Sequence, residues 1–219
     1  MYKLVIFDLD GTLLNTIGDL AASCDFALSK CGFPLHTKDE YCSFVGNGIT
    51  KLIERALPSD RRDENTVSMV KGYFLWHYSS NNTVLTEPYR GTRELLEKLQ
   101  SHGAILAVAS NKYNEATKKI ISHFFPQINF IAVLGQRDGI PIKPDAHVIH
   151  EIIDLAKVSP EETIYVGDSV VDASTAADIN GITYICVTWG FCHREELEKY
   201  GIRSFVSAAS EIWNIYSEN

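Results

Sequence analysis

Short apolar runs recur along this chain, and segments with helical patterning lie between most of them. The runs occupy residues 4–7, 105–109, 130–134, 164–166 and 184–187. Each is largely apolar without alternation, which is typical of strands that a parallel sheet buries on both faces. Segments such as 92–100 and 145–156 place leucine, isoleucine and valine at helical spacing. Strands that alternate with helices predict an α/β fold with a doubly wound, Rossmann-like parallel sheet.

Residues 16–86 break this alternation, because helical patterns follow one another there and no buried strand is predicted. One helix stripe is formed by Ile17, Ala21, Cys24, Leu28 and Cys31. We therefore predict two domains, an α/β core of residues 1–15 and 87–219 and a small helical cap of residues 16–86. Ligands of open α/β sheets bind beyond the carboxyl ends of the strands. A cap inserted directly after the first strand is thus predicted to cover the binding site.

Charge and cysteine content argue against several classes of protein. The 28 acidic and 20 basic residues give a net charge of -8, which disfavours a nucleic-acid partner. No apolar run approaches the roughly 18 residues of a membrane span, so no membrane partner is expected. The five cysteines include no C-x-x-C pair, which favours reduced thiols and a cytoplasmic location. A monomer and a homodimer both remain open.

Four carboxylates are expected at one edge of the predicted sheet. Asp8 and Asp10 come directly after the first apolar run, and Asp168 and Asp172 follow the fourth. Helix capping or a turn could explain any single one of them. Several carboxylates at one sheet edge would repel one another unless a cation lay between them. Mg²⁺ prefers oxygen ligands and shares its site with phosphate groups, so the pattern predicts a magnesium site.

Ser110, Asn111 and Lys143 are candidates to bind a phosphate group. Ser110 and Asn111 follow the second apolar run and precede a helical segment, where a hydroxyl and backbone N–H groups can cradle phosphate. Lys143 precedes another helix. Singly, each has an ordinary explanation, because serine often caps helices and most lysines are solvated surface charges. Their combination with the carboxylates is what favours a phosphate site.

These candidates occur in a characteristic order along the chain. The order is Asp8-x-Asp10, then Ser110, then Lys143, then Gly167-Asp168-x-x-x-Asp172. It resembles the ordered motifs of the haloacid dehalogenase superfamily of phosphohydrolases, and the resemblance covers essentially the whole chain. The helical insert is similar to the cap of that family in its small helical form.

The resemblance implies a role for each catalytic and phosphate-binding candidate. It implies that Asp8 is the nucleophile and forms an aspartyl-phosphate, and that Asp10 is the general acid and base. It also implies that Ser110, Asn111 and Lys143 bind the phosphoryl group.

The same resemblance implies how the metal is bound. Mg²⁺ would be held by Asp8, by Asp168 and by the backbone carbonyl of Asp10. Asp172 would support this arrangement from one helical turn beyond Asp168.

Further segments indicate which branch of the superfamily the chain resembles. Three of them look like phosphoglycolate phosphatase-type enzymes: Val45-Gly46-Asn47-Gly48, Pro88-Tyr89-Arg90-Gly91 and Val187-Thr188-Trp189-Gly190. Asn47 and Gly48 are expected on a cap loop that closes over the leaving group of the substrate. An ordinary helix-entry turn would suit the same two residues. Asn15 departs from many relatives, which have aspartate there, but it lies outside the catalytic motifs.

The resemblance therefore implies a Mg²⁺-dependent phosphatase of small phosphorylated metabolites, with 2-phosphoglycolate as the expected substrate. An inorganic pyrophosphatase and a β-phosphoglucomutase-type mutase are alternatives within the superfamily. Leu20 opposes the mutase, which usually carries a histidine near that position. A receiver-like, phospho-accepting signalling module is the alternative from a different class. The helical cap and Asp10 favour turnover over such a module.

Overall fold

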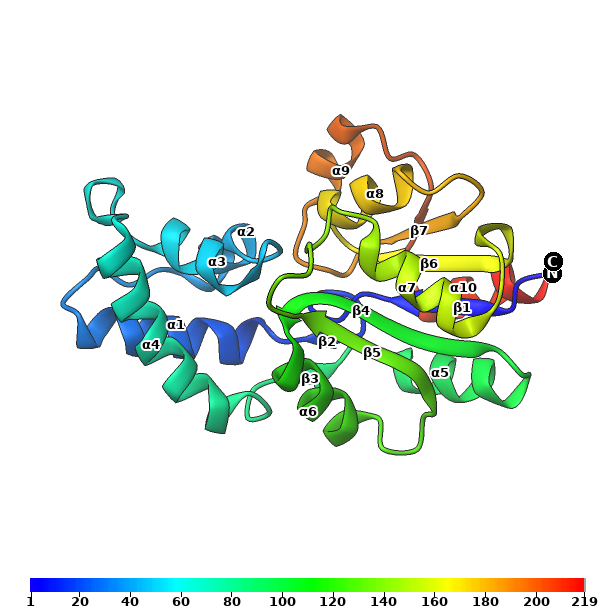
Figure 1. The fold of residues 1–219 in the computed structure, drawn as a ribbon, viewed down its shortest axis with the longest axis horizontal. Coiled ribbons are helices and arrows are strands. Elements are labelled where there is room, and N and C mark those ends of the chain that lie inside the picture. The colour runs from blue at the N-terminus through cyan, green and yellow to red at the C-terminus, as the bar shows by residue number, and fades with distance from the viewer. Residues whose placement is uncertain (219) are drawn as a thin grey trace.

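The larger part of the molecule is a parallel β-sheet covered by helices on both faces. The structure is a computed structural model that describes residues 1–218 (Figure 1). The strands of the sheet are β1 (Leu4–Phe7), β4 (Ile105–Tyr113), β5 (Phe130–Gln136), β6 (Thr163–Gly167), β7 (Thr183–Val187) and β8 (Phe205–Val206). These six lie in the order β5-β4-β1-β6-β7-β8, and every neighbouring pair is parallel. The predicted α/β fold is confirmed.

The central strand β1 shows why its sequence is apolar without alternation. The helices around the sheet are α5 (Thr92–Ser101), α6 (Asn114–Phe124), α7 (His147–Ala156), α8 (Val170–Ala177), α9 (Arg194–Tyr200) and α10 (Ala209–Ser217). Val5 and Phe7 share a hydrophobic cluster with residues of α5, α6 and α10. Leu4 and Ile6 face the other way and share a cluster with residues of α7 and α8. Successive side chains of β1 are thus buried on opposite faces.

Strand β4 is longer than its apolar run predicts. The run ends at Ala109, whereas the strand continues to Tyr113 with a register irregularity against β5. Ser110, Asn111 and Lys112 are polar, yet all three are buried in this extension. The sequence does not signal a strand there, because these side chains are buried among polar partners rather than in the apolar core.

A helical insertion follows β1, as predicted. Its helices are α1 (Ile17–Lys30), α2 (Lys38–Phe44), α3 (Gly48–Ala56) and α4 (Glu64–Asn81). They lie to one side of the sheet, with α1 and α4 packed against each other (Figure 1). Cys24 and Leu28 of the predicted stripe are fully buried, as are Val70 and Phe74 of α4. The stripe therefore forms the core of the insertion.

Two short connections join the insertion to the sheet, and both were absent from the predicted elements. They form a small antiparallel pair, β2 (Leu14–Asn15) and β3 (Glu87–Pro88). The buried carboxylate of Asp19 accepts backbone N–H bonds from Val84, Leu85 and Thr86 at 2.8–3.1 Å. A carboxylate on α1 thereby fixes the returning segment to the start of the insertion.

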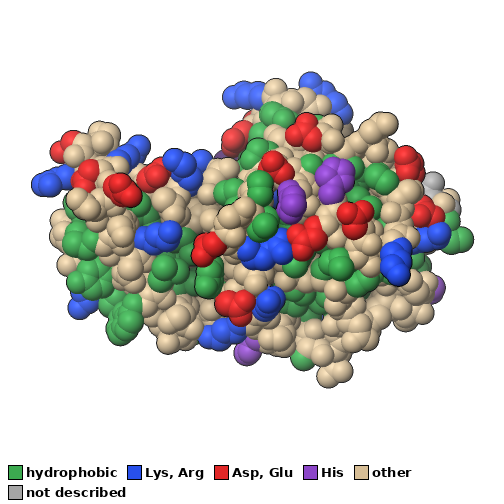
Figure 2. All heavy atoms as spheres, viewed as in Figure 1, with side chains coloured by type: hydrophobic (Ala, Val, Ile, Leu, Met, Phe, Trp, Pro, Cys, Tyr) green, Lys and Arg blue, Asp and Glu red, His purple; other side chains and the backbone are tan. Residues whose placement is uncertain are grey.

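The surface carries mixed charge on the face drawn in Figure 2, where acidic and basic side chains are interspersed and a notch separates the insertion from the core. Among residues 1–218, no helix combines the length and the apolar character that crossing a bilayer requires. All five cysteines have free thiols, and their reduced state in the cell stays a prediction. The cytoplasmic location stays a prediction.

Candidate active site

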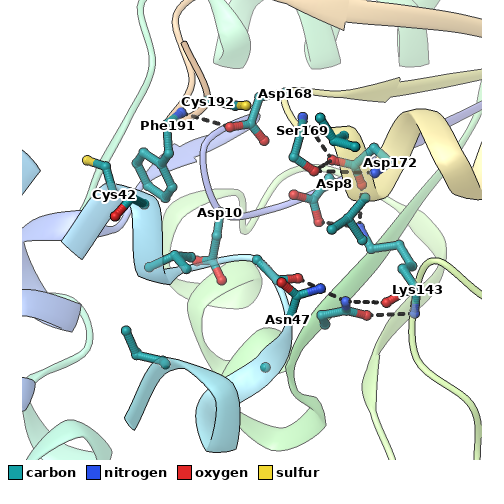
Figure 3. Close-up of a pocket in the computed structure, with 18 of the residues that line it drawn as sticks. Asp8, Asp10, Cys42, Asn47, Lys143, Asp168, Ser169, Asp172, Phe191 and Cys192 are labelled. Carbon is teal, nitrogen blue, oxygen red and sulfur yellow. Dashed lines mark hydrogen bonds and ion pairs between the residues drawn. The ribbon is translucent and has the colours of Figure 1, made fainter. Parts of the chain in front are cut away.

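A cavity of about 340 Å³ lies between the helical insertion and the carboxyl ends of the strands. The core contributes acidic and lysine side chains from the ends of β1, β4 and β6 and from the loop before α7. The insertion contributes the loop at residues 45–48 and parts of α2 and α3. Figure 3 shows Asp8, Asp168 and Asp172 together on the core side, with Cys42 and Asn47 on the side of the insertion. The predicted site residues therefore converge on one cavity.

Lys143 lies at the centre of the core wall. Its Nζ donates hydrogen bonds to Asp8 Oδ1 and Asp172 Oδ1, both at 2.7 Å, and to the Ala109 carbonyl at 2.9 Å. The lysine side chain is only 3% exposed. Burial alone would lower the pKa of Lys143, but the carboxylates of Asp172 and Asp8 outweigh this and raise it. The alternative of a solvated surface lysine is wrong.

Asp172 is held by donors on both of its oxygens. Oδ1 accepts from Lys143 and from the Tyr165 hydroxyl, which lies 2.5 Å away. Oδ2 accepts from the hydroxyl and the backbone N–H of Ser169. Burial would raise the pKa of Asp172, but the charge of Lys143 and these hydrogen bonds lower it overall. With both oxygens engaged, Asp172 is better suited to orienting Lys143 than to binding a ligand of its own.

Asp168 has fewer partners and is closely surrounded by backbone. Its Oδ2 accepts from the Phe191 N–H at 2.8 Å and its Oδ1 accepts from the Thr12 hydroxyl at 3.2 Å. Burial and the neighbouring Asp172 raise the pKa of Asp168 to about 7. Gly11 and Gly190 lie so close that a Cβ at either position would come within 2.3 Å of this side chain. Glycine is therefore required at both places to admit the carboxylate.

Asp8, Asp168 and Asp172 together concentrate negative charge at one place, which favours a cation held by Asp8 and Asp168 beside Asp172. One oxygen from each lies within 4.8 Å of the others, and all three residues are buried. Burial raises the pKa of Asp8 well above its ordinary value, and the charges of Asp172 and Asp168 add to the rise while Lys143 opposes it. One lysine does not balance three buried carboxylates, so a divalent ion would relieve the remaining repulsion. All-oxygen donors favour a hard cation.

Asp10 lies apart from this cluster and has its own lysine, Lys112, which the sequence did not single out. Lys112 Nζ donates to both carboxylate oxygens of Asp10, at 2.9 and 3.0 Å, and the Thr16 hydroxyl donates to Oδ1 at 2.6 Å. Lys112 also lies over the ring of Tyr78 on α4, 4.9 Å from its centroid. Burial would lower the pKa of Lys112, but Asp10 and Tyr78 raise it overall. A buried lysine becomes recognisable only once its carboxylate partner is known.

Ser110 and Asn111 reach the site from the end of β4. Ser110 Oγ accepts the N–H of Lys112 at 3.2 Å and lines the cavity. The side-chain oxygen of Asn111 accepts the N–H of Lys143 at 2.9 Å, and its Nδ2 donates to the carbonyls of Lys143 and Gly46 at 2.8 and 3.0 Å. Asn111 therefore links the Lys143 loop to the insertion. A phosphate-binding role for Ser110 and Asn111 stays a prediction, and the side-chain amide of Asn111 is already engaged.

Asn47 and Gly48 lie where α3 begins, on the wall formed by the insertion. Asn47 occupies the position before the helix but makes no capping hydrogen bond, because its Oδ1 accepts from Arg55 Nη2 at 2.7 Å. Gly48 has a φ of +79°, a left-handed conformation that favours glycine. A Cβ there would also lie 3.0 Å from Gln136 Oε1 of the core. The loop is thus shaped to approach the core closely.

Tyr165 is a second residue that the sequence did not single out, and we expect it to position Lys143. Its hydroxyl donates to Asp172 and accepts from Lys143 Nζ at 3.1 Å. Tyr165→Phe should lower kcat/KM for the phosphate esters that the sequence predicts as substrates about three- to tenfold, because one hydrogen bond that orients Lys143 is lost. Tyr184→Phe is the matched control, since that ring contacts Tyr165 while its hydroxyl donates to the Ser169 carbonyl at 3.4 Å. Equal kinetics for Tyr165→Phe and Tyr184→Phe would contradict the positioning role.

Comparisons with known proteins agree with this arrangement. A family model described as haloacid dehalogenase-like hydrolase matches residues 5–187. The chain is 34% identical over 205 residues to a phosphoglycolate phosphatase of Cereibacter sphaeroides (strain ATCC 17025 / ATH 2.4.3), which covers 91% of this chain and 92% of the relative. It is 31% identical over 196 residues to a phosphoglycolate phosphatase of Haemophilus influenzae (strain 86-028NP), covering 87% of each.

A solved structure is similar over nearly the whole length. It is described as a predicted phosphoglycolate phosphatase from Haemophilus somnus 129pt, and the TM-score is 0.90 at 27% sequence identity. The match covers 98% of this chain and 97% of that one, so the insertion and the sheet are both included. With a matching family model, relatives above 30% identity and the site just described, the chain belongs to the haloacid dehalogenase-like hydrolase family.

Proposed function

We propose that this hydrolase is a Mg²⁺-dependent phosphatase of small phosphate monoesters and that 2-phosphoglycolate is its substrate. The observation that carries the proposal is the buried Asp8–Lys143 pair, which faces the cavity at the end of β1 beside Asp168. The relatives named as phosphoglycolate phosphatases support the choice of substrate. Residues 16–86 act as the cap, and residues 1–15 and 87–219 form the catalytic core.

The first step is attack by Asp8 on phosphorus. Its Oδ1 accepts the hydrogen bond from Lys143, so Oδ2 is the oxygen that forms the new O–P bond. The ester O–P bond breaks, and Asp10, which must enter this step protonated, gives its proton to the departing alkoxide. Lys143 supplies positive charge beside the transferring group, and Ser110 supplies a hydroxyl.

The second step restores the enzyme. Asp10, now deprotonated, takes a proton from water as the water oxygen attacks phosphorus. The acyl-phosphate O–P bond breaks, which releases inorganic phosphate and returns Asp8 to a carboxylate. Asp8, Asp168 and the backbone carbonyl of Asp10 would hold Mg²⁺, with Asp172 supporting them through Lys143. When bound, the metal supplies the charge that offsets repulsion between a carboxylate nucleophile and an anionic ester.

A panel of phosphate compounds tests this function. We expect many turnovers of phosphate release in Mg²⁺, with the highest kcat/KM for 2-phosphoglycolate among that ester, p-nitrophenyl phosphate, pyrophosphate and a hexose 1-phosphate. Preference for pyrophosphate would assign a pyrophosphatase, and isomerisation of the hexose phosphate would assign a mutase. One equivalent of persistent phosphoprotein without turnover would assign a receiver-like module.

Metal binding should be visible in stability as well as in activity. Mg²⁺ at ten times its dissociation constant should stabilise the wild type by about 1.4 kcal/mol, and Asp168→Asn should lose most of this gain.

The raised pKa of Asp168, about 7 against an ordinary 3.8, determines how this stabilisation depends on pH. Without metal, its contribution to stability is fully present below pH 4 and is lost as pH rises through 7. The Mg²⁺-induced rise in Tm should therefore be larger at pH 8 than at pH 6.

Thermal unfolding in Mg²⁺ and in excess chelator, at both pH values, measures this effect. An identical Mg²⁺-induced shift in the wild type and in Asp168→Asn would place the metal elsewhere. Full activity in excess chelator would contradict the metal requirement itself.

A further inference from the structure

Arg55 of α3 lines the catalytic cavity from the side of the cap. Among the described residues of the cap that line this cavity, it is the one lysine or arginine. Its Nη1 donates to the Phe44 carbonyl at 2.8 Å and its Nη2 donates to Asn47 Oδ1 at 2.7 Å. Both acceptors are uncharged, and none of the ion pairs within residues 1–218 includes Arg55.

The two lysines of the cavity differ from Arg55 in this respect. Lys112 is paired with Asp10, and Lys143 is paired with Asp8 and Asp172. Within residues 1–218, Arg55 is therefore the arginine or lysine of the cavity that forms no ion pair with a carboxylate.

Two other carboxylates line the cavity, and neither of them forms an ion pair with Arg55. Asp39 and Glu196 are exposed to solvent and form no ion pair with Arg55. Water and salt screen exposed carboxylates strongly. A group bound inside the cavity would be screened less and would interact more strongly with the guanidinium.

We propose that Arg55 binds the carboxylate of the substrate's leaving group, and this inference rests on the proposed function. An arginine presents five N–H donors in a fixed planar fork that matches a carboxylate. Phe44 and Asn47 engage two of these donors and orient the guanidinium, while the others are available to a ligand. The substrates selected are small phosphomonoesters that carry an anionic group close to the ester oxygen.

This inference also changes the role expected of Asn47. Its side-chain oxygen holds Arg55, so Asn47 acts on the substrate through the arginine instead of by direct contact. Binding energy from the remote carboxylate assists the reaction at phosphorus, and esters without that carboxylate do not receive this assistance.

Two esters with closely related leaving groups test the proposal. 2-Phosphoglycolate carries a carboxylate where 2-hydroxyethyl phosphate carries a neutral hydroxymethyl group. Arg55→Met should lower kcat/KM for 2-phosphoglycolate about 10- to 100-fold and leave 2-hydroxyethyl phosphate within about twofold. Lys51→Met is the matched control, because Lys51 lies one turn earlier on α3, is exposed and pairs with Glu54. The control should leave the ratio of the two kcat/KM values unchanged.

Two more variants separate recognition from folding of the cap. Arg55→Lys keeps the positive charge but loses the planar fork of N–H donors. Its ratio of kcat/KM for 2-phosphoglycolate to kcat/KM for 2-hydroxyethyl phosphate should lie between the ratios of the wild type and Arg55→Met. Asn47→Ala removes the side-chain oxygen that holds Arg55 and should also lower this kcat/KM ratio. Equal proportional losses on both esters for Arg55→Met and Arg55→Lys would make Arg55 a structural residue and overturn the proposal.

A second pair of esters tests the role of Arg55 if 2-phosphoglycolate is not the substrate. If the wild type does not hydrolyse 2-phosphoglycolate, the same variants are compared on 3-phosphoglycerate and glycerol 3-phosphate, which again differ in a carboxylate. A preference for the carboxylated ester that Arg55→Met removes would sustain the role of Arg55 while the proposed substrate is abandoned. No such preference in the wild type would overturn both.

Discussion

Asp8→Asn should reduce phosphate release by at least about 10⁴-fold while the protein stays folded. An amide cannot form the covalent phospho-enzyme, although its oxygen can still accept the hydrogen bond that Asp8 accepts from Lys143 at 2.7 Å. Because burial raises the pKa of Asp8, the ionised carboxylate is costly in the metal-free protein. The variant should therefore have a Tm equal to or above that of the metal-free wild type. Steady-state phosphate release and thermal unfolding in chelator measure the two effects.

Chemical trapping makes this prediction specific to the nucleophile. Wild-type enzyme quenched in acid during turnover should carry a hydroxylamine-sensitive acyl-phosphate, and Asp8→Asn should carry none. Asp154→Asn is a suitable control, because this exposed aspartate on α7 lies outside the cavity. Residual activity of Asp8→Asn above one hundredth of the wild-type value would contradict the assignment.

The strands that could be predicted from sequence are those whose side chains contact a hydrophobic cluster on each face of the sheet. The runs at β1, β4, β5, β6 and β7 are apolar because helices cover both sides of the sheet, and that composition is visible in the residues themselves. β2, β3 and β8 have two residues each, which is too short to show any periodicity. Their pairing depends on where the insertion and the chain end return to the sheet, and this is a tertiary property.

The residues of the site divide in the same way, into those that the local sequence pattern reveals and those that only tertiary contacts bring to the cavity. Asp8, Asp168 and Lys143 could be expected together, because each follows a strand or precedes a helix at one edge of a parallel sheet. Lys112 and Arg55 could not, since their roles depend on contacts that local pattern does not encode. Lys112 pairs with Asp10 across 102 positions of sequence, and Arg55 reaches the cavity only because α3 faces the core.

Asp10→Asn should affect the two chemical steps unequally. Protonation of the leaving group matters little for p-nitrophenolate and much for an alkoxide, whereas water activation is needed with either ester. With p-nitrophenyl phosphate, the variant should release a burst of about one equivalent of p-nitrophenol and then turn over about 10²- to 10⁴-fold more slowly than the wild type. With 2-phosphoglycolate no burst is expected, because formation of the phospho-enzyme is slowed too.

Asp10→Asn should make the protein less stable, whereas Asp8→Asn should not. Lys112 donates to both oxygens of Asp10 at 2.9 and 3.0 Å and is only 3% exposed, so losing the carboxylate leaves a buried ammonium without its counter-charge. We expect Asp10→Asn to lower the free energy of unfolding by about 1–3 kcal/mol. The double variant Asp10→Asn/Lys112→Met should recover much of that stability and none of the activity, because the acid and base is still missing. A double variant that regained turnover would show that the loss in Asp10→Asn came from the unpaired lysine, and the acid–base role of Asp10 would have to be abandoned.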